Sequence, residues 1–208
     1  MKRSPSRHAF TLIEMITVIT IIAILTGLVL SIAGLVQNKG TRSKAQAEIN
    51  ALSAACEAYK ADLGSYPQET ATDSLDARSA TAPSSYQAAS LALYKALSGD
   101  TDLDGKPNSN VNETGKVYAT DFFKPARFNS SFKTNGKVAF ITDPFGNSYG
   151  YSTAGLKAEQ DFRTQLATDD QATRAAASKG YNSTFDLWST GGATGSSDND
   201  KGKWLKNW

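Results

Sequence analysis

The apolar residues of the chain are concentrated in one long run near the N-terminus. The segment from Ala9 to Val36 is apolar with one charged exception, Glu14, and it follows the short basic stretch MKRSPSRHA. A bilayer is spanned by about 20 such residues in a helix. Positive residues on the short side favour a cytoplasmic N-terminus and export of the bulk of the chain. The pattern therefore predicts a single transmembrane helix over 10–36.

The helical pattern continues beyond this run with a different periodicity. Spacings of three and four residues line one face of a helix, and Gly64 followed by Pro67 ends it. We expect one helix from Thr11 to Leu63, apolar all round in its first half and amphipathic in its second, as if packed on a sheet. The residues of the amphipathic face are Ala45, Ile49, Leu52, Cys56, Tyr59 and Leu63.

Shorter patterns predict the remaining elements. A second helix is expected within 83–99, capped by Ser84 or Ser85 and ended by Gly99. A hairpin is expected at Asn135–Gly136. Strands are expected at 116–123, 126–134, 137–142, 148–151 and 183–190, with a turn at 143–146, a helical insertion within 154–179 and a glycine-rich tail after the last strand. A helix laid across a small antiparallel sheet is an α+β fold.

Composition narrows the function classes. The 208 residues suit one globular domain with an appendage, and the net charge of +2 with scattered Lys and Arg favours no nucleic-acid partner. One cysteine, Cys56, excludes an intramolecular disulfide, and a single histidine, His8, supplies no zinc spacing. No catalytic triad, paired-acid site or phosphate loop is identifiable, so we expect no enzyme. Trp188, Trp204 and Trp208 are expected to pack against the sheet.

Glu14 is the one charged residue in the apolar segment, and its presence there needs an explanation. A carboxylate within a membrane segment costs free energy unless a partner meets it, and it is therefore a functional hypothesis. A plain signal anchor would leave Glu14 without a purpose. So would a cleaved secretory signal, for which Ser31 and Ala33 stand at the small-residue positions.

The stretch HAFTLIEM accounts for Glu14, because it resembles the processing site of type IV prepilins and type II secretion pseudopilins. The resemblance implies that a prepilin peptidase removes residues 1–9 as a leader, cutting between Ala9 and Phe10, and that Phe10 is then N-methylated. Ala9 stands where the family usually has glycine. Glu14 would neutralise the terminal amine of a neighbouring subunit during assembly, since a carboxylate and an amine are tolerable together in a low dielectric.

Three further stretches resemble the major pseudopilin of type II secretion: YKADLGSYP (59–67), DPFGNSYGY (143–151) and FDLWSTG (185–191). The segments between them, 68–142 and 152–184, are enlarged relative to the compact pseudopilin pattern. The resemblance implies a type IV pilin-like fold, with 10–36 as the membrane and polymerisation helix. Residues 37–208 would then form the periplasmic or extracellular globular domain.

The resemblance also implies a function as a structural subunit of a type IV pilus-like or secretion pseudopilus filament. Such a subunit waits in the bacterial inner membrane, in contact with lipid, and later joins a filament in the periplasm or at the cell surface. Its partners would be other pilin-like subunits, the prepilin peptidase and methylase, and an inner-membrane assembly platform with its ATPase. The alternative is a membrane-anchored, adhesin-like binding module that does not polymerise. Pilus and pseudopilus, and major and minor subunit, stay open.

Two acidic loops suggest calcium. In DTDLDGKPNSN, the residues Asp100, Asp102 and Asp104 alternate and Gly105 is sixth, which is the opening of an EF-hand-type loop. Val111 stands at the twelfth position, where a bidentate glutamate belongs. An acidic, solvated turn is the alternative.

The second acidic loop follows the FDLWSTG strand. In major pseudopilins the equivalent loop binds calcium, and the resemblance matches Asp198 and Asp200 to its later aspartates. The earlier aspartate is replaced near Ala193. A flexible tail rich in Gly, Ser and Asp is the alternative.

Overall fold

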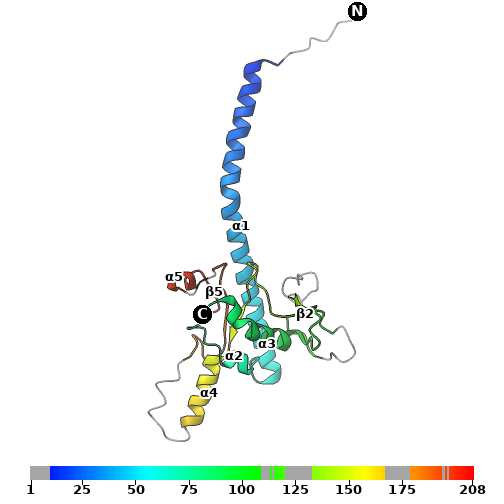
Figure 1. Ribbon diagram of the computed structural model, residues 1–208, viewed down its shortest axis with the longest axis vertical. Helices are drawn as coiled ribbons and strands as arrows, with labels where there is room; N and C mark the ends of the chain where they lie inside the picture. Colours follow the sequence, from blue (N-terminus) through cyan, green and yellow to red (C-terminus); the bar gives the residue numbers. More distant parts are fainter. Residues whose placement is uncertain are drawn as a thin grey trace, which may run out of the picture. The chain divides into compact units, whose positions relative to one another are not determined.

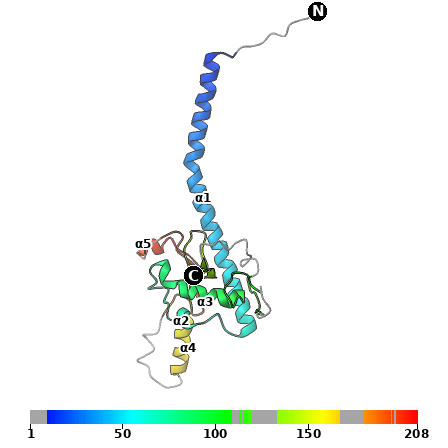
Figure 2. The ribbon, with the colours of Figure 1, turned by 45° about the vertical axis from the view of Figure 1, so that its right-hand side comes forward.

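The computed structural model describes residues 10–108, 113, 115–119, 133–166, 179–193, 195 and 197–208, without the side chains of 29, 31–35, 133, 165 and 166. The chain divides into two compact units, Met1–Gly40 and Thr41–Trp208. The second unit contains the sheet, the shorter helices and the C-terminal part of α1. Figures 1 and 2 show the elements of this unit.

The predicted long helix is confirmed as α1, Leu12–Leu63. It ends at Gly64, whose φ of +80° is accessible to glycine and whose N–H donates to the Lys60 carbonyl at 2.8 Å. The predicted inward position of Leu63 is wrong, because 59% of its surface is exposed. Tyr66, which follows the turn, is buried in the core instead.

The sheet is smaller than predicted. Strands β3 (Gly150–Ser152), β4 (Asp186–Ser189) and β5 (Leu205–Lys206) form one antiparallel sheet in the order β3-β4-β5. Trp188 lies opposite both Gly150 and Lys206. A Cβ at Gly150 would lie 2.0 Å from the Trp188 ring, so this close pairing requires glycine. The α+β prediction is confirmed.

The predicted hairpin is also confirmed. Strands β1 (Lys133–Thr134) and β2 (Lys137–Val138) pair antiparallel on either side of Asn135 and Gly136. These two turn residues have φ values of +52° and +77°. Positive φ at both central residues is the conformation that an Asn-Gly hairpin turn adopts.

Five short helices complete the described structure. The predicted helix in 83–99 begins as a 3-10 turn, and neither Ser84 nor Ser85 caps the α-helix that follows, because Ser85 Oγ donates to the Ala82 carbonyl. Gly99 ends that helix with φ of +68°, as predicted. The helices are α2 (Thr70–Asp73), η1 (Pro83–Tyr86), α3 (Gln87–Ser98), α4 (Ala154–Leu166) and α5 (Asp198–Lys201).

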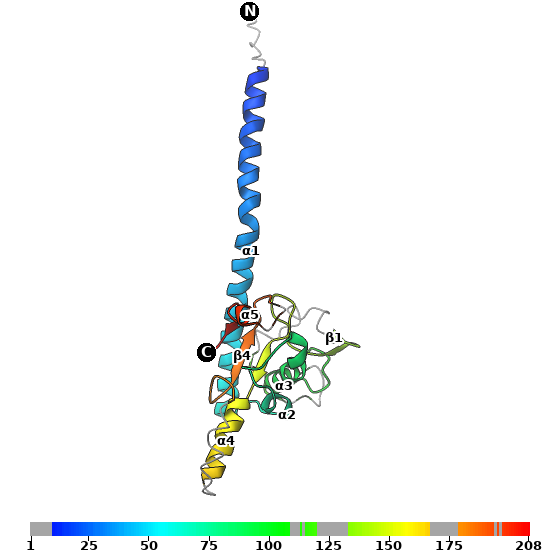
Figure 3. The ribbon, with the colours of Figure 1, turned by 60° about the vertical axis from the view of Figure 1, so that its left-hand side comes forward.

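Several strand predictions are wrong. Residues 116–119 are not a strand, and 139–142 contribute one bridge between Thr142 and Ser148. Residues 120–132, where two strands were expected, and 167–178, the second half of the predicted helical insertion, lie outside the described residues. The strand at β4 is not the last, because the tail forms α5 and returns as β5 to pair with β4 (Figure 3). β5 could not be predicted from the sequence, because a strand of two residues is too short to show the alternation of apolar and polar residues.

The core of Thr41–Trp208 joins the amphipathic part of α1 to α3 and the sheet. Ile49, Leu52 and Cys56 are buried with Leu93 and Leu97 of α3, and Figures 1 and 2 show α3 lying crosswise to the cyan part of α1. The tryptophans form a second cluster, in which Trp188 and Trp204 are buried and stacked and Trp208 packs against them. The predicted packing roles of Cys56 and the tryptophans are confirmed.

The three stretches that resemble the major pseudopilin contact one another. Tyr66 and Phe185 have ring centroids 5.1 Å apart, and the Tyr151 hydroxyl donates to the Pro67 carbonyl at 2.9 Å. Ser189 Oγ donates to Asp143 Oδ2, and Asp143 Oδ1 accepts hydrogen bonds from the backbone N–H groups of Phe145 and Asn147. These distant segments of sequence therefore build one side of the domain core.

Candidate functional site

Glu14 lies at the start of α1 and binds Thr11. Its Oε2 accepts hydrogen bonds from the Thr11 backbone N–H and hydroxyl, both at 2.9 Å, and its own N–H donates to Thr11 Oγ1 at 3.3 Å. This is the reciprocal arrangement of a capping box, which the spacing T-x-x-E permits. Phe10 is 74% exposed, and Ala9 lies outside the described residues. Glu14 therefore has a local structural role that the sequence analysis missed.

The side chains that follow form an exposed apolar surface around α1. The hydroxyls of Thr17, Thr20 and Thr26 donate to the backbone carbonyls four residues earlier, so these polar groups are satisfied within the helix. The exposed residues include Leu12, Ile13, Ile16, Ile19, Ile21, Ile22, Ile24, Leu25, Leu28 and Leu30, each more than half accessible.

The described part of the chain contains no helix that is both long enough and apolar enough to cross a membrane. The predicted span, 10–36, includes Val29 and 31–35, whose side chains lie outside the described residues.

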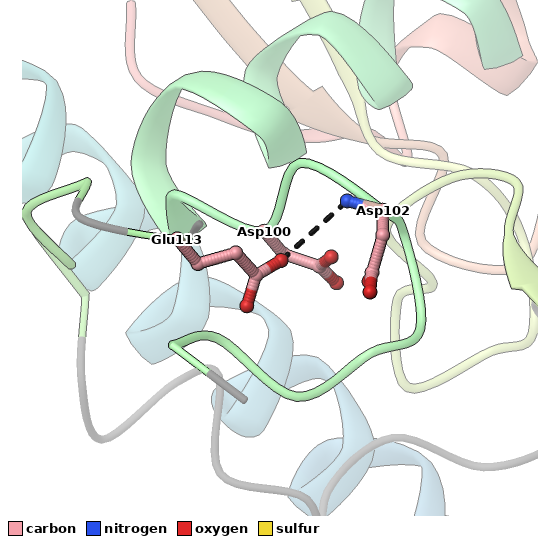
Figure 4. Close-up of side chains that lie close together, drawn as sticks. All are labelled: Asp100, Asp102 and Glu113. Carbon is pink, nitrogen blue, oxygen red and sulfur yellow. Dashed lines mark hydrogen bonds between the residues drawn. The ribbon is translucent and has the colours of Figure 1, made fainter. Parts of the chain in front are cut away.

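A cluster of three carboxylates lies directly after α3. Asp100, Asp102 and Glu113 each place one carboxylate oxygen within 4.8 Å of the others (Figure 4). Asp100 and Glu113 are buried, with 1% and 5% of their surfaces exposed, and Asp102 is exposed. Glu113 Oε1 accepts hydrogen bonds from the backbone N–H groups of Thr101 at 3.0 Å and Asp102 at 3.5 Å.

Asp100 is the most constrained member of this cluster. Its Oδ2 accepts hydrogen bonds from the Tyr94 hydroxyl and from the Gly105 N–H, the latter at 2.8 Å. Its Oδ1 is buried and has no hydrogen-bond partner in the described part of the chain. Burial raises the pKa of Asp100, and the Glu113 charge raises it further, while the hydrogen bond from Tyr94 opposes both effects.

The loop separates its predicted ligands. Asp104 does not join the group of three, and its Oδ1 accepts the Lys106 N–H at 2.7 Å. Gly105 has a φ of +82°, which supports its predicted role in a sharp turn. Val111 lies outside the described residues. Glu113, two positions beyond Val111, was not predicted as a ligand, because an EF-hand-type loop ends at its twelfth position.

The C-terminal acidic loop is arranged differently. Asp198 and Asp200 lie on α5, which Ser197 caps by accepting the Asp200 N–H. Asp200 also accepts a hydrogen bond from the Ser197 hydroxyl and forms an ion pair with Lys203 at 3.3 Å. Within the described residues, neither aspartate belongs to a group of three potential metal ligands. Calcium at this loop stays a prediction.

Comparison with known proteins gives two family-model matches in the N-terminal half of the chain. The family model of the prokaryotic N-terminal methylation motif matches residues 4–30. The family model of the type II secretion system (T2SS), protein G, matches residues 35–101. Both matches support identification of the chain as type IV pilin-like or pseudopilin. No curated protein and no solved structure matches the chain.

The family is structural rather than enzymatic, and its members are subunits of secretion or pilus systems. Pseudopilins form multi-subunit filaments and are processed by prepilin peptidase. The methylation motif implies a membrane-anchored precursor that later enters a surface filament. Of the two matched regions, the first contains Phe10 and Glu14, and the second ends just after Asp100. Asp102 and Glu113 lie outside both matched regions.

Proposed function

We propose that this chain is a pseudopilin and a filament subunit, assembled through residues 10–36 after cleavage between Ala9 and Phe10 and methylation of Phe10. The match to T2SS protein G favours a secretion pseudopilus over a pilus. Glu14 then pairs with the terminal amine of a neighbouring subunit.

The observation that carries the proposal is the apolar surface on all sides of α1 between Leu12 and Leu30. Burying one Leu or Ile side chain stabilises a structure by about 1.5–3 kcal/mol, and here many such side chains are left exposed together. Lipid before assembly and neighbouring helices after it both supply the missing apolar contact. A helix with a single partner needs an apolar stripe only, whereas a helix surrounded by lipid or by other helices is apolar all round.

The geometry of Glu14 is compatible with a second partner. Both hydrogen bonds from Thr11 reach Oε2, and Oε1 accepts none from the described residues. A carboxylate offers about four acceptor positions. An amine of a neighbouring subunit can therefore bind Oε1 without breaking the cap, and the pair is much less costly in an apolar bundle than either charge alone.

The experiment separates the charge of Glu14 from its capping role. Glu14→Gln removes the charge and keeps an acceptor for Thr11, since glutamine also serves in capping boxes. Thr11→Val removes the hydroxyl and keeps the charge, and Thr20→Ala is a control within the same apolar segment. Each variant is expressed with the secretion machinery, the mass of the mature chain is measured, and filaments are quantified by shear fractionation and electron microscopy.

We expect a mature chain that starts at methylated Phe10 in every variant. Filaments should be lost in Glu14→Gln and should form normally in Thr11→Val and Thr20→Ala. Loss with Thr11→Val and normal filaments with Glu14→Gln would assign Glu14 to capping and contradict the amine pairing. An uncleaved chain in the membrane without filaments would favour the anchored binding module. A start at Gly34 would indicate ordinary secretion.

A further inference from the structure

We propose that Asp100, Asp102 and Glu113 form a calcium site at the end of α3. The proposal concerns a different part of the molecule from the filament segment and does not depend on it. It replaces Asp104 of the alternating aspartates with Glu113, which the fold brings to the cluster from further along the chain.

The spacing of the three carboxylates suits calcium. Calcium binds oxygen ligands at about 2.4 Å, so two ligands of one ion lie at most about 4.8 Å apart. The three ligand oxygens lie within 4.8 Å of one another. All are hard carboxylate oxygens, which favour calcium over metals that prefer nitrogen or sulfur.

A second and independent observation is the buried Oδ1 of Asp100. The hydrogen bonds from the Tyr94 hydroxyl and the Gly105 N–H to this side chain both reach Oδ2. Oδ1 has no donor within the described part of the chain, although the residue is 1% exposed. A buried carboxylate oxygen without a partner is costly, and a cation shared with Asp102 and Glu113 would supply that partner (Figure 4).

The surrounding backbone holds the ligands before any ion binds. The Thr101 N–H fixes Glu113 Oε1. Gly99 and Gly115 approach so closely that a Cβ on Gly99 would lie 3.0 Å from the Gly115 carbonyl oxygen. Directly beyond, the Tyr118 N–H donates to the Leu97 carbonyl at 2.9 Å. Calcium would therefore join the end of α3 to the segment that leads into the core at Val117–Ala119.

The test uses the full chain in detergent micelles, stripped with a chelator. Calcium binding is measured by isothermal titration calorimetry, and thermal unfolding is compared in calcium and in chelator. We expect one bound calcium ion per chain, together with a rise in Tm of about 5 °C or more at about hundredfold excess over Kd. Magnesium should bind more weakly.

The variants assign the site. Asp102→Asn changes an exposed ligand and should weaken calcium binding by about tenfold or more, with the Tm in chelator unchanged. Asp100→Asn should weaken calcium binding as well. Because Asp100 is buried, this substitution can also affect folding, so its result is interpreted only together with that of Asp102→Asn. Asp104→Asn in the same loop and Asp200→Asn on α5 should each bind calcium within about twofold of the parent chain.

Two results would overturn the assignment. One is an identical melting curve in millimolar calcium and in chelator, together with no binding heat. The other is calcium binding that survives Asp102→Asn and is lost with Asp104→Asn or Asp200→Asn. Neither result bears on filament assembly, because the assay needs no secretion machinery.

Discussion

The helix α1 carries two kinds of apolar surface. From Leu12 to Leu30 its large apolar side chains are exposed on all sides, whereas from Ala45 onwards one face is buried and the opposite face is polar. Leu52 and Cys56, on the buried face, are fully inaccessible. The distribution of apolar residues around a helix thus indicates where its partner lies. A stripe has its partner within the domain, and an all-round apolar surface requires lipid or other chains.

The largest expected effect comes from removing the first surface entirely. Deletion of residues 1–33 should give a soluble domain that unfolds cooperatively, because Ile49 and Leu52 belong to the core and the deleted residues do not. Gel filtration and thermal unfolding measure this. Deletion of residues 1–52, which also removes part of the buried face, is the matched control and should aggregate. Aggregation of the shorter deletion would show that the two surfaces are not separable.

Single substitutions compare the two surfaces directly. Leu52→Ala should reduce the free energy of unfolding by about 2–5 kcal/mol, because it leaves a cavity in the core. Ile22→Ala, at a position that is 56% exposed, should change it by less than about 0.5 kcal/mol. Denaturant unfolding of both full-length variants in detergent measures the difference. Equal losses would contradict the division of α1 into a core face and a face for other partners.

The smallest effect tests a polar contact on the buried part of α1. The Tyr149 hydroxyl donates to Glu48 Oε2 at 2.6 Å, and both side chains are buried. Tyr149→Phe leaves a buried carboxylate with one donor fewer, so it should cost about 1–3 kcal/mol of unfolding free energy.

The control for this contact is Tyr181→Phe. Tyr181 is 46% exposed, and its substitution should be close to neutral while its stacking on Trp208 is retained. If both variants were neutral in denaturant unfolding, the contact to Glu48 would not contribute to holding α1 against the sheet.

The prediction from sequence was most accurate where a feature depends on neighbouring residues. The apolar run, the end of α1 at Gly64 and the hairpin at Asn135–Gly136 follow from local spacing and from glycine's access to positive φ. The capping box of Thr11 and Glu14 was equally local and could have been found from its T-x-x-E spacing.

The acidic loop shows the limit of that approach. Alternation identified Asp100 and Asp102 but also included Asp104, because spacing along the chain cannot say which carboxylates converge. Glu113 reaches the cluster because the chain folds back and brings Gly115 against Gly99. The spacing of residues along the chain does not predict this contact between Gly99 and Gly115.

The sequence by itself determined the bounds of α1, the contrast between its two surfaces and the Phe10–Glu14 motif, since each is written in adjacent residues. Tertiary structure alone decided that the tail returns as β5, that Tyr66 rather than Leu63 enters the core, and that Glu113 joins Asp100. These features depend on contacts between segments far apart in the chain. Their stability comes from the burial and hydrogen bonds that form when those segments meet, which the spacing of residues along either segment does not encode.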